Sequence, residues 1–154
     1  MLFATHLLLG MLFFLIFKNM FSGGNEIIFF LLMLLGSILP DIDERDSTIN
    51  QWTGIFGRII SFFFKHRGIF HSLFLALLLF FSISVYWSTY YATALLLGYI
   101  AHLVGDSFSP SGIQMFYPFS QFKFKGPMKV GGFMEWVIVI LLVVLVIVVL
   151  RKLI

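Results

Sequence analysis

Long apolar segments constrain this chain more than any other feature of its sequence. Between Phe133 and Leu150 the single charged residue is Glu135. A helix that crosses the hydrocarbon core of a bilayer needs about 20 predominantly apolar residues. The whole chain is 60% hydrophobic and 11% charged, whereas a soluble domain has roughly 25% charged residues. The sequence therefore predicts an integral membrane protein.

Five such segments predict an all-α fold, a multi-pass transmembrane helical bundle of about five spans. At this length we expect one integral membrane domain, residues 1–154. The predicted spans are residues 2–17, 26–39, about 69–87, about 89–104 and 133–150. The first segment could instead be a signal peptide, which would remove His6. It lacks a basic n-region, however, and no small-x-small cleavage site follows Phe17.

The two long connections between spans carry aromatic side chains that suit the membrane interface. In residues 41–68, apolar side chains recur at helical spacing and predict an amphipathic helix lying in the interface. They are Trp52, Ile55, Phe56, Ile59, Ile60 and Phe63. Residues 107–131 combine aromatic and basic side chains, which suits a segment that rests on lipid headgroups.

The distribution of basic residues predicts an orientation. Five spans place the N-terminus and both long connections on one side of the membrane. All Lys and Arg residues except Lys18, Arg151 and Lys152 belong to that side, namely Arg45, Arg58, Lys65, Arg67, Lys123, Lys125 and Lys129. Because cytoplasmic loops carry an excess of Lys and Arg, we expect this side to face the cytoplasm from the cell (inner) membrane.

Ionisable residues gather at the same predicted edge of the bundle. An ionisable side chain near lipid is costly, and its presence there indicates a function. The chain has four histidines and no cysteine, so a transition metal would be held by imidazole and carboxylate groups. The candidate metal ligands are His6, Asp41, Asp43, His66, His71, His102, Asp106 and Glu135.

The spacing of these residues suits a shared site. His102 and Asp106 are four residues apart, so a helix places them on one face. Asp41 and Asp43 point the same way if the loop after Pro40 is extended, where they could bridge two cations or share a proton. A single helix would not align His66 with His71. Gly68 interrupts that segment, however, so His66 could reach in from the loop.

Each residue taken alone also has a structural explanation. A histidine at a helix end is often a cap, and Asp41 and Asp43 could be solvated or cap a following helix. Glu135 could cap the last span or complement its N-terminal dipole. Glu26, Glu44 and Asp46 are best explained in this way. The convergence of every histidine beside acids is what favours a metal site.

Three sequence blocks carry a family resemblance. They are Leu39-Pro40-Asp41-Ile42-Asp43, then His66-Arg67-Gly68-Ile69-Phe70-His71, and then Gly98-Tyr99-Ile100-Ala101-His102-Leu103-Val104-Gly105-Asp106. In this order they resemble the YdjM-like family, described as membrane-bound metal-dependent hydrolases and as LexA-binding inner-membrane hydrolase-like proteins. The family usually has Thr where this chain has Phe70. The family is itself distantly similar to zinc phospholipase C and P1-type nucleases.

The resemblance implies an enzyme that uses metal ions. Together with the residues it predicts a membrane-embedded hydrolase that cleaves a phosphoester, with a phospholipid-like substrate at the membrane surface. We expect two or three Zn²⁺ ions, with Mn²⁺ or Fe²⁺ as alternatives. Asp41 or Asp43 would be a bridging ligand or general base, and Arg67 would hold the phosphate.

Two other classes of function remain open at this point. One is a non-enzymatic metal-binding membrane protein. The other is a scaffold that recruits a cytoplasmic partner through residues 41–68. Membrane lipid is an expected partner of such an apolar chain. No nucleic acid is expected, because no run of basic residues suits one.

Overall fold

The computed structural model describes residues 1–64 and 66–153, with only the backbone of Leu153. Lys65, counted above among the basic residues, lies outside the described residues. Within the described residues the regular secondary structure is helical, which confirms the all-α class. The α-helices are α1 (Phe3–Phe17), α2 (Glu26–Ile38), α3 (Thr48–Thr53), α4 (Ile55–Phe63), α5 (Leu73–Tyr86), α6 (Thr89–Ser107) and α7 (Phe133–Leu153). The 3₁₀ turns are η1 (Lys18–Met20), η2 (Leu39–Asp43) and η3 (Ile69–His71).

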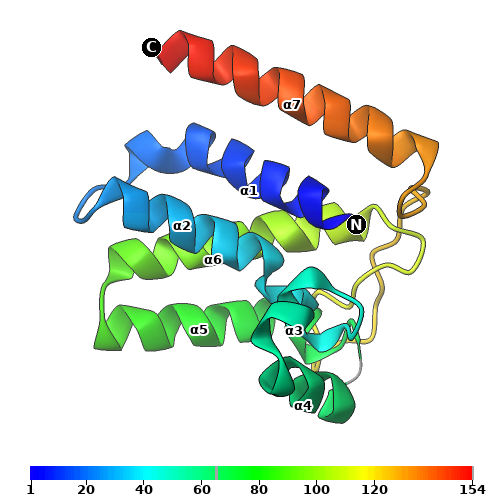
Figure 1. Ribbon diagram of the computed structural model, residues 1–154. Coiled ribbons are helices and arrows are strands. Elements are labelled where there is room, and N and C mark those ends of the chain that lie inside the picture. The colour runs from blue at the N-terminus through cyan, green and yellow to red at the C-terminus, as the bar shows by residue number, and fades with distance from the viewer. Residues whose placement is uncertain (65, 154) are drawn as a thin grey trace.

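The five long helices run alongside one another, and the two short ones gather at one end (Figure 1). The N-terminus, α3, α4, the start of α7 and the loop after α6 all lie at this end. The α1–α2 and α5–α6 connections lie at the opposite end. The chain segments that the five-span prediction assigned to one side thus lie together.

Two helices among the described residues are long and apolar enough to cross a membrane. They correspond to Phe3–Met20 and Phe133–Lys152. α2 has 13 residues and α5 has 14, so at about 1.5 Å per residue each is only about 20 Å long. The hydrocarbon core is about 30 Å thick. Five complete spans are therefore not confirmed.

The predicted amphipathic helix forms as two helices, α3 and α4, rather than one. Gly54 separates them with φ 60°, a left-handed conformation that ends α3. The buried Asn50 side chain donates hydrogen bonds to the carbonyl oxygens of Ile42 and Gly57, both at 2.7 Å. The apolar side chains predicted for the lipid interface are mostly exposed, as in Phe56 and Phe63.

The closest helix packing joins α2 to α6 and depends on two glycines. A Cβ atom at Gly98 would overlap the main-chain carbonyl of Met33, and one at Gly36 would overlap the carbonyl of Leu95. The two backbones can approach only because both side chains are absent, which is a frequent arrangement between membrane helices. This contact fixes the position of α6 one turn before His102.

Replacing Gly98 with valine is expected to destabilise the protein by about 1–3 kcal/mol, because the added atoms must displace backbone rather than a flexible side chain. We also expect the variant to bind less metal, since α6 carries His102. Thermal unfolding in detergent and elemental analysis would measure both effects. Ile100→Val, two residues along α6 at a partly exposed position, is the control. Equal unfolding temperatures for the two variants would contradict the prediction.

Candidate metal centre

One end of the bundle collects the predicted site residues from five parts of the chain. His6 lies in α1, Asp41 and Asp43 in η2, and His71 in η3. His102 and Asp106 lie in the last turns of α6, and His66 and Arg67 lie in the loop before η3. The side chains of His6, Asp43, His71, His102 and Asp106 are almost completely buried. A set this polar needs partners that compensate for burial.

Asp41, His71, His102 and Asp106 form the tightest group, in which one ligand atom from each lies within 4.8 Å of the others. His71 Nε2 lies 3.3 Å from His102 Nε2, 3.5 Å from Asp41 Oδ1 and 3.5 Å from Asp106 Oδ2. His102 Nε2 lies 3.6 Å from Asp41 Oδ1. A tetrahedral ion with ligands at about 2.1 Å requires ligand atoms roughly 3.4 Å apart. These separations are long for hydrogen bonds but fit the edges of such a tetrahedron.

Second contacts orient the two histidines of this group. His102 Nδ1 lies 2.8 Å from the carbonyl oxygen of Ser37, to which its N–H donates, so Nε2 faces the carboxylates. His71 Nδ1 lies 3.4 Å from Asp43 Oδ2, which places a carboxylate behind this ring. Metal-binding histidines are commonly held by a carbonyl or carboxylate in this way. Asp43 thus occupies the place of a group that orients a ligand.

His6 completes one wall of the cluster. Its ring stacks on His102 with centroids 3.8 Å apart, and its Nε2 lies 3.4 Å from Asp106 Oδ1 and 4.0 Å from Asp41 Oδ2. Among the described residues, neither ring nitrogen of His6 has a hydrogen-bond partner, although the side chain is fully buried. A buried imidazole without partners is costly, and a nearby cation would satisfy one of its two nitrogens.

A second group consists of Asp43, His66 and His71. His66 Nδ1 lies 2.9 Å from Asp43 Oδ1 and its Nε2 lies 3.1 Å from Glu44 Oε2. Sequence reasoning set Glu44 aside as a helix-capping acid. Glu44 lies beside His66 because the chain turns at η2, and the spacing of residues in the sequence did not predict that turn.

Arg67 is bound within the protein. Its guanidinium pairs with Asp106 Oδ2 at 3.1 Å and donates to Ser109 Oγ at 2.6 Å and to the Gly112 carbonyl at 3.1 Å. Its own backbone has φ 61°, which is unfavourable for a residue with a side chain. These contacts leave little of the guanidinium group free to hold a phosphate, which was the role predicted for Arg67. They hold Asp106 in position instead.

Glu135 lies apart from both groups, and its oxygens have other partners. Oε1 accepts hydrogen bonds from Leu2 N at 2.7 Å and Thr5 Oγ1 at 3.0 Å, and Oε2 accepts one from Gly131 N at 2.7 Å. The side chain is fully buried. The first turn of α1 has no side-chain cap of its own, so Glu135 caps α1 from another helix.

The carboxylates and histidines of the cluster shift one another's ionisation. Burial alone would raise the pKa of Asp41, but the hydrogen bond from His71 and the neighbouring His102 and His6 outweigh it and hold the pKa below its usual range. Burial would lower the pKa of His71, but the carboxylates around it raise that pKa to about 10. Asp106 also meets the α-amino group of Met1 at 2.6 Å. The carboxylates of the cluster therefore favour a positive charge among them, whether from a protonated histidine, an ammonium group or a metal ion.

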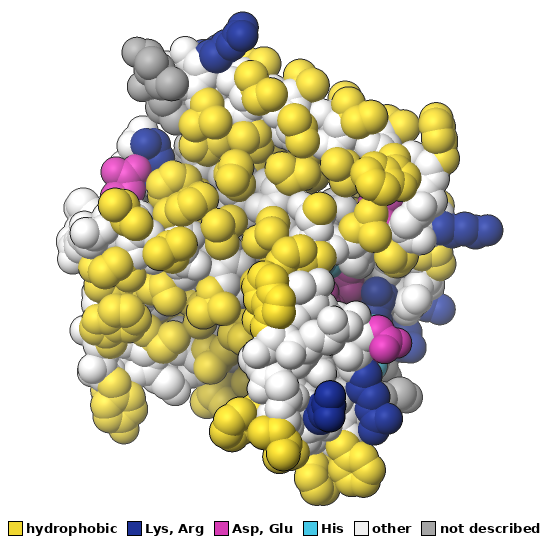
Figure 2. Space-filling view, viewed as in Figure 1, with side chains coloured by type: hydrophobic (Ala, Val, Ile, Leu, Met, Phe, Trp, Pro, Cys, Tyr) yellow, Lys and Arg dark blue, Asp and Glu magenta, His cyan; other side chains and the backbone are white. Residues whose placement is uncertain are grey.

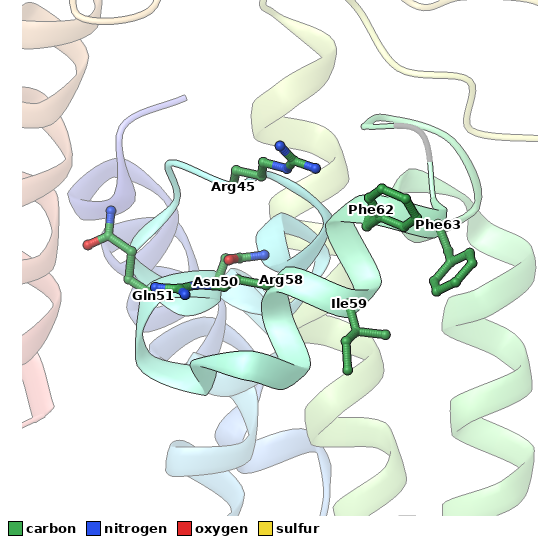
Figure 3. Close-up of a pocket in the computed structure, with 7 residues that line it drawn as sticks. All are labelled: Arg45, Asn50, Gln51, Arg58, Ile59, Phe62 and Phe63. Atoms are coloured by element: carbon green, nitrogen blue, oxygen red, sulfur yellow. The ribbon is translucent and has the colours of Figure 1, made fainter.

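Two cavities differ in their relation to this cluster. The larger, about 650 Å³, lies over α3 and α4 between Arg45, Arg58 and Phe62 and includes none of the predicted ligands (Figure 3). A cavity of about 400 Å³ reaches Asp41, His66 and Arg67. Its apolar wall consists of Met1, Leu2, Phe3, Ile49 and Val130. Asp41 is the partly exposed member of the tight group, so solvent approaches the cluster on this side.

The fold and the site define an all-helical protein that combines a buried histidine–carboxylate cluster with two helices long and apolar enough to cross a membrane. The profile of the YdjM inner membrane protein family matches residues 1–153, and the chain belongs to this family. This confirms the resemblance seen in the three sequence blocks.

Two relatives show the extent of the similarity. The chain is 34% identical over 104 residues to the uncharacterized protein YvsG of Bacillus subtilis, covering 66% of this chain and 64% of YvsG. It is 31% identical over 103 residues to the inner membrane protein YdjM of Escherichia coli, covering 63% of this chain and 52% of that protein. The matched part of the chain thus spans less than two thirds of each relative. No solved structure matches, so the distant similarity to zinc phospholipase C and P1-type nucleases stays a prediction.

Proposed function

We propose that this protein is a membrane-embedded metal-dependent hydrolase that cleaves a phosphoester at the membrane surface. The observation that supports the proposal is the group of Asp41, His71, His102 and Asp106. Four pairs of its ligand atoms lie 3.3 to 3.6 Å apart, close to the edge of a tetrahedral site for a divalent ion. When bound, such an ion polarises a phosphoryl oxygen and lowers the pKa of a bound water.

We propose one tightly held ion in this group. A second ion at Asp43, His66 and His71 would need both ring nitrogens of His71, because Nε2 faces the first group and Nδ1 faces Asp43. That arrangement requires an imidazolate. The simpler assignment makes Asp43 the residue that orients His71 and His66. Zn²⁺ remains the first choice for a site of imidazole and carboxylate ligands, with Mn²⁺ and Fe²⁺ as alternatives.

The surroundings of the cluster favour a lipid-borne substrate. In the cavity that reaches Asp41, an apolar wall that includes Phe3 and Ile49 lies beside His66 and Arg67. An amphiphile whose phosphate faces the cluster would place its apolar part against that wall. His66 is partly exposed there and is hydrogen-bonded to Asp43, so it is the side chain best placed to exchange a proton with substrate.

We also propose that all five long helices are embedded in the cell (inner) membrane with the cluster at the cytoplasmic edge. Hydrophobic side chains cover the middle of the face seen in Figure 2, and charged side chains lie towards its ends. The short helices α2 and α5 would then require local thinning of the bilayer or burial of their ends in protein. The excess of Lys and Arg at the cluster end supports this orientation, because cytoplasmic loops are enriched in these residues.

The purified protein is expected to hold a stoichiometric divalent ion and to release phosphate or a headgroup from lipid phosphomonoesters or phosphodiesters. Chelator should abolish the release, and re-addition of the metal found by elemental analysis should restore it. Substrates would be screened in mixed micelles with Asp41→Asn as the inactive control. A protein that purifies without metal and cannot be loaded would refute the proposal.

One observation favours a second candidate, a non-enzymatic metal-binding membrane protein. Four protein ligands close a tetrahedral site, as in structural zinc sites, whereas catalytic sites keep a position for water. This candidate predicts the same stoichiometric ion, no hydrolysis of any lipid phosphoester, and unfolding when chelator removes the ion. The exposure of Asp41 to the adjoining cavity is the reason to place the hydrolase first.

A further inference from the structure

A smaller cavity of about 240 Å³ adjoins the cluster through His66 and Arg67. The rest of its wall comes from the loop after α6, through Ser111, Gly112, Gln114 and Lys123. Arg67 links it to the cluster, because the same guanidinium that donates to the Gly112 carbonyl pairs with Asp106. A ligand in this cavity would therefore lie beside the metal centre.

The chemistry of the wall suits an anion. Among the described residues, no Asp or Glu lines this cavity. In the cavity that reaches Asp41, by contrast, a bound ion would have to offset Asp41, Glu44 and Asp46 before a phosphate could enter. The Lys123 ammonium group offers three hydrogen-bond donors. Within residues 1–64 and 66–153, Lys123 forms no ion pair. A lysine of this kind is a common ligand for phosphate.

The wall is also held in place. Ile113 and Phe124 form an antiparallel bridge with hydrogen bonds of 2.9 and 3.0 Å, which places Lys123 opposite Gln114, another residue of the cavity wall. Gly112 has φ 65°, and a Cβ there would overlap the Phe124 carbonyl. Because the loop is tied at this point, the backbone that carries Lys123 is already in place before a ligand arrives, and this reduces the entropic cost of binding.

We propose that this cavity binds a phosphate-type oxyanion, with Lys123 as its charged ligand. The inference builds on the proposed function in one respect: a phosphate held beside the metal centre is either a second phosphate group of a lipid substrate or the phosphate that hydrolysis releases. The binding of the oxyanion itself requires only the residues that line the cavity.

Isothermal titration of inorganic phosphate into the full chain in phosphatidylcholine nanodiscs tests the proposal. Lys123→Ala is expected to weaken phosphate binding at least about ten-fold, the effect of losing one charge-assisted hydrogen bond. Lys125 is exposed, as Lys123 is, but lies outside the cavity. Lys125→Ala and Lys123→Arg should therefore bind phosphate as the parent does. Nanodiscs that also contain phosphatidic acid distinguish the sources: competition with inorganic phosphate identifies a lipid phosphate, and its absence identifies the free anion.

Parallel samples separate this inference from the proposed function. Elemental analysis should show the same metal content in the parent and in Lys123→Ala, and titration after chelator treatment should still depend on Lys123. If the protein proved to bind no metal, phosphate binding should still depend on Lys123. Equal phosphate affinity in the parent and Lys123→Ala, or no phosphate binding by the parent, would overturn the inference.

Discussion

Replacing His71 with alanine is expected to remove the bound metal, whereas His66→Ala should retain it. His71 Nε2 lies within 3.5 Å of three other ligand atoms of the buried group, so its loss removes the ligand that all of them face. His66 belongs only to the outer group and is partly exposed. Elemental analysis of the purified variants, with circular dichroism to establish that each remains helical, measures the difference.

Asp43→Asn makes the comparison quantitative. If Asp43 orients His71 and does not bind the metal, this variant keeps the stoichiometry of the parent and weakens affinity about 10- to 100-fold, as removal of an outer carboxylate commonly does. Competition with a chelating indicator would measure the affinity. Loss of metal from His66→Ala together with retention by His71→Ala would show that the ion belongs to neither arrangement described above.

Glu135→Ala is expected to destabilise the protein by on the order of 3 kcal/mol, because three donors on two separate segments lose a buried acceptor. The first turn of α1 should loosen, and with it the position of His6. A lower unfolding temperature in detergent and faster hydrogen exchange at the start of α1 are the measurements.

Glu26→Ala provides the matched control for this variant. Glu26 also lies in the first turn of a helix, but it is exposed and pairs with Lys18 at 3.1 Å, a contact worth under about 1 kcal/mol. If both substitutions lowered the unfolding temperature equally, Glu135 would have no special role in holding α1 to α7.

Much of the site could be predicted from the sequence because its residues lie at span ends. The i to i+4 spacing of His102 and Asp106 placed both on one face of α6, and Gly68 allowed His66 and His71 to approach the same place. The relative positions of Asp41 and Asp43 depended on the backbone conformation after Pro40, which was predicted to be extended. That segment is a 3₁₀ turn rather than an extended loop, so Asp41 and Asp43 lie on different sides of His71.

Other features depended on contacts that no local pattern contains. Arg67 forms an ion pair with Asp106, which is distant from it in the chain. Glu135 accepts hydrogen bonds from Leu2 and Thr5 at the other end of the chain. The bounds of α2 were predicted closely, since the expected segment was residues 26–39 and the helix is Glu26–Ile38. What hydropathy does not decide is whether a helix this short crosses the membrane. The break at Gly54 could have been anticipated from its position between two apolar turns.

The absence of cysteine gains a meaning from the way η2 meets α6. Asp41 and Asp106 belong to one cluster, although α3, α4 and α5 lie between them in the chain. An ion shared by these two residues would act as a cross-link that closes this long loop, a stabilisation that disulfides supply in oxidising compartments. Such a cross-link forms without oxidation and reverses when the ion leaves. The assembly of the bundle would then respond to the metal supply of the cell.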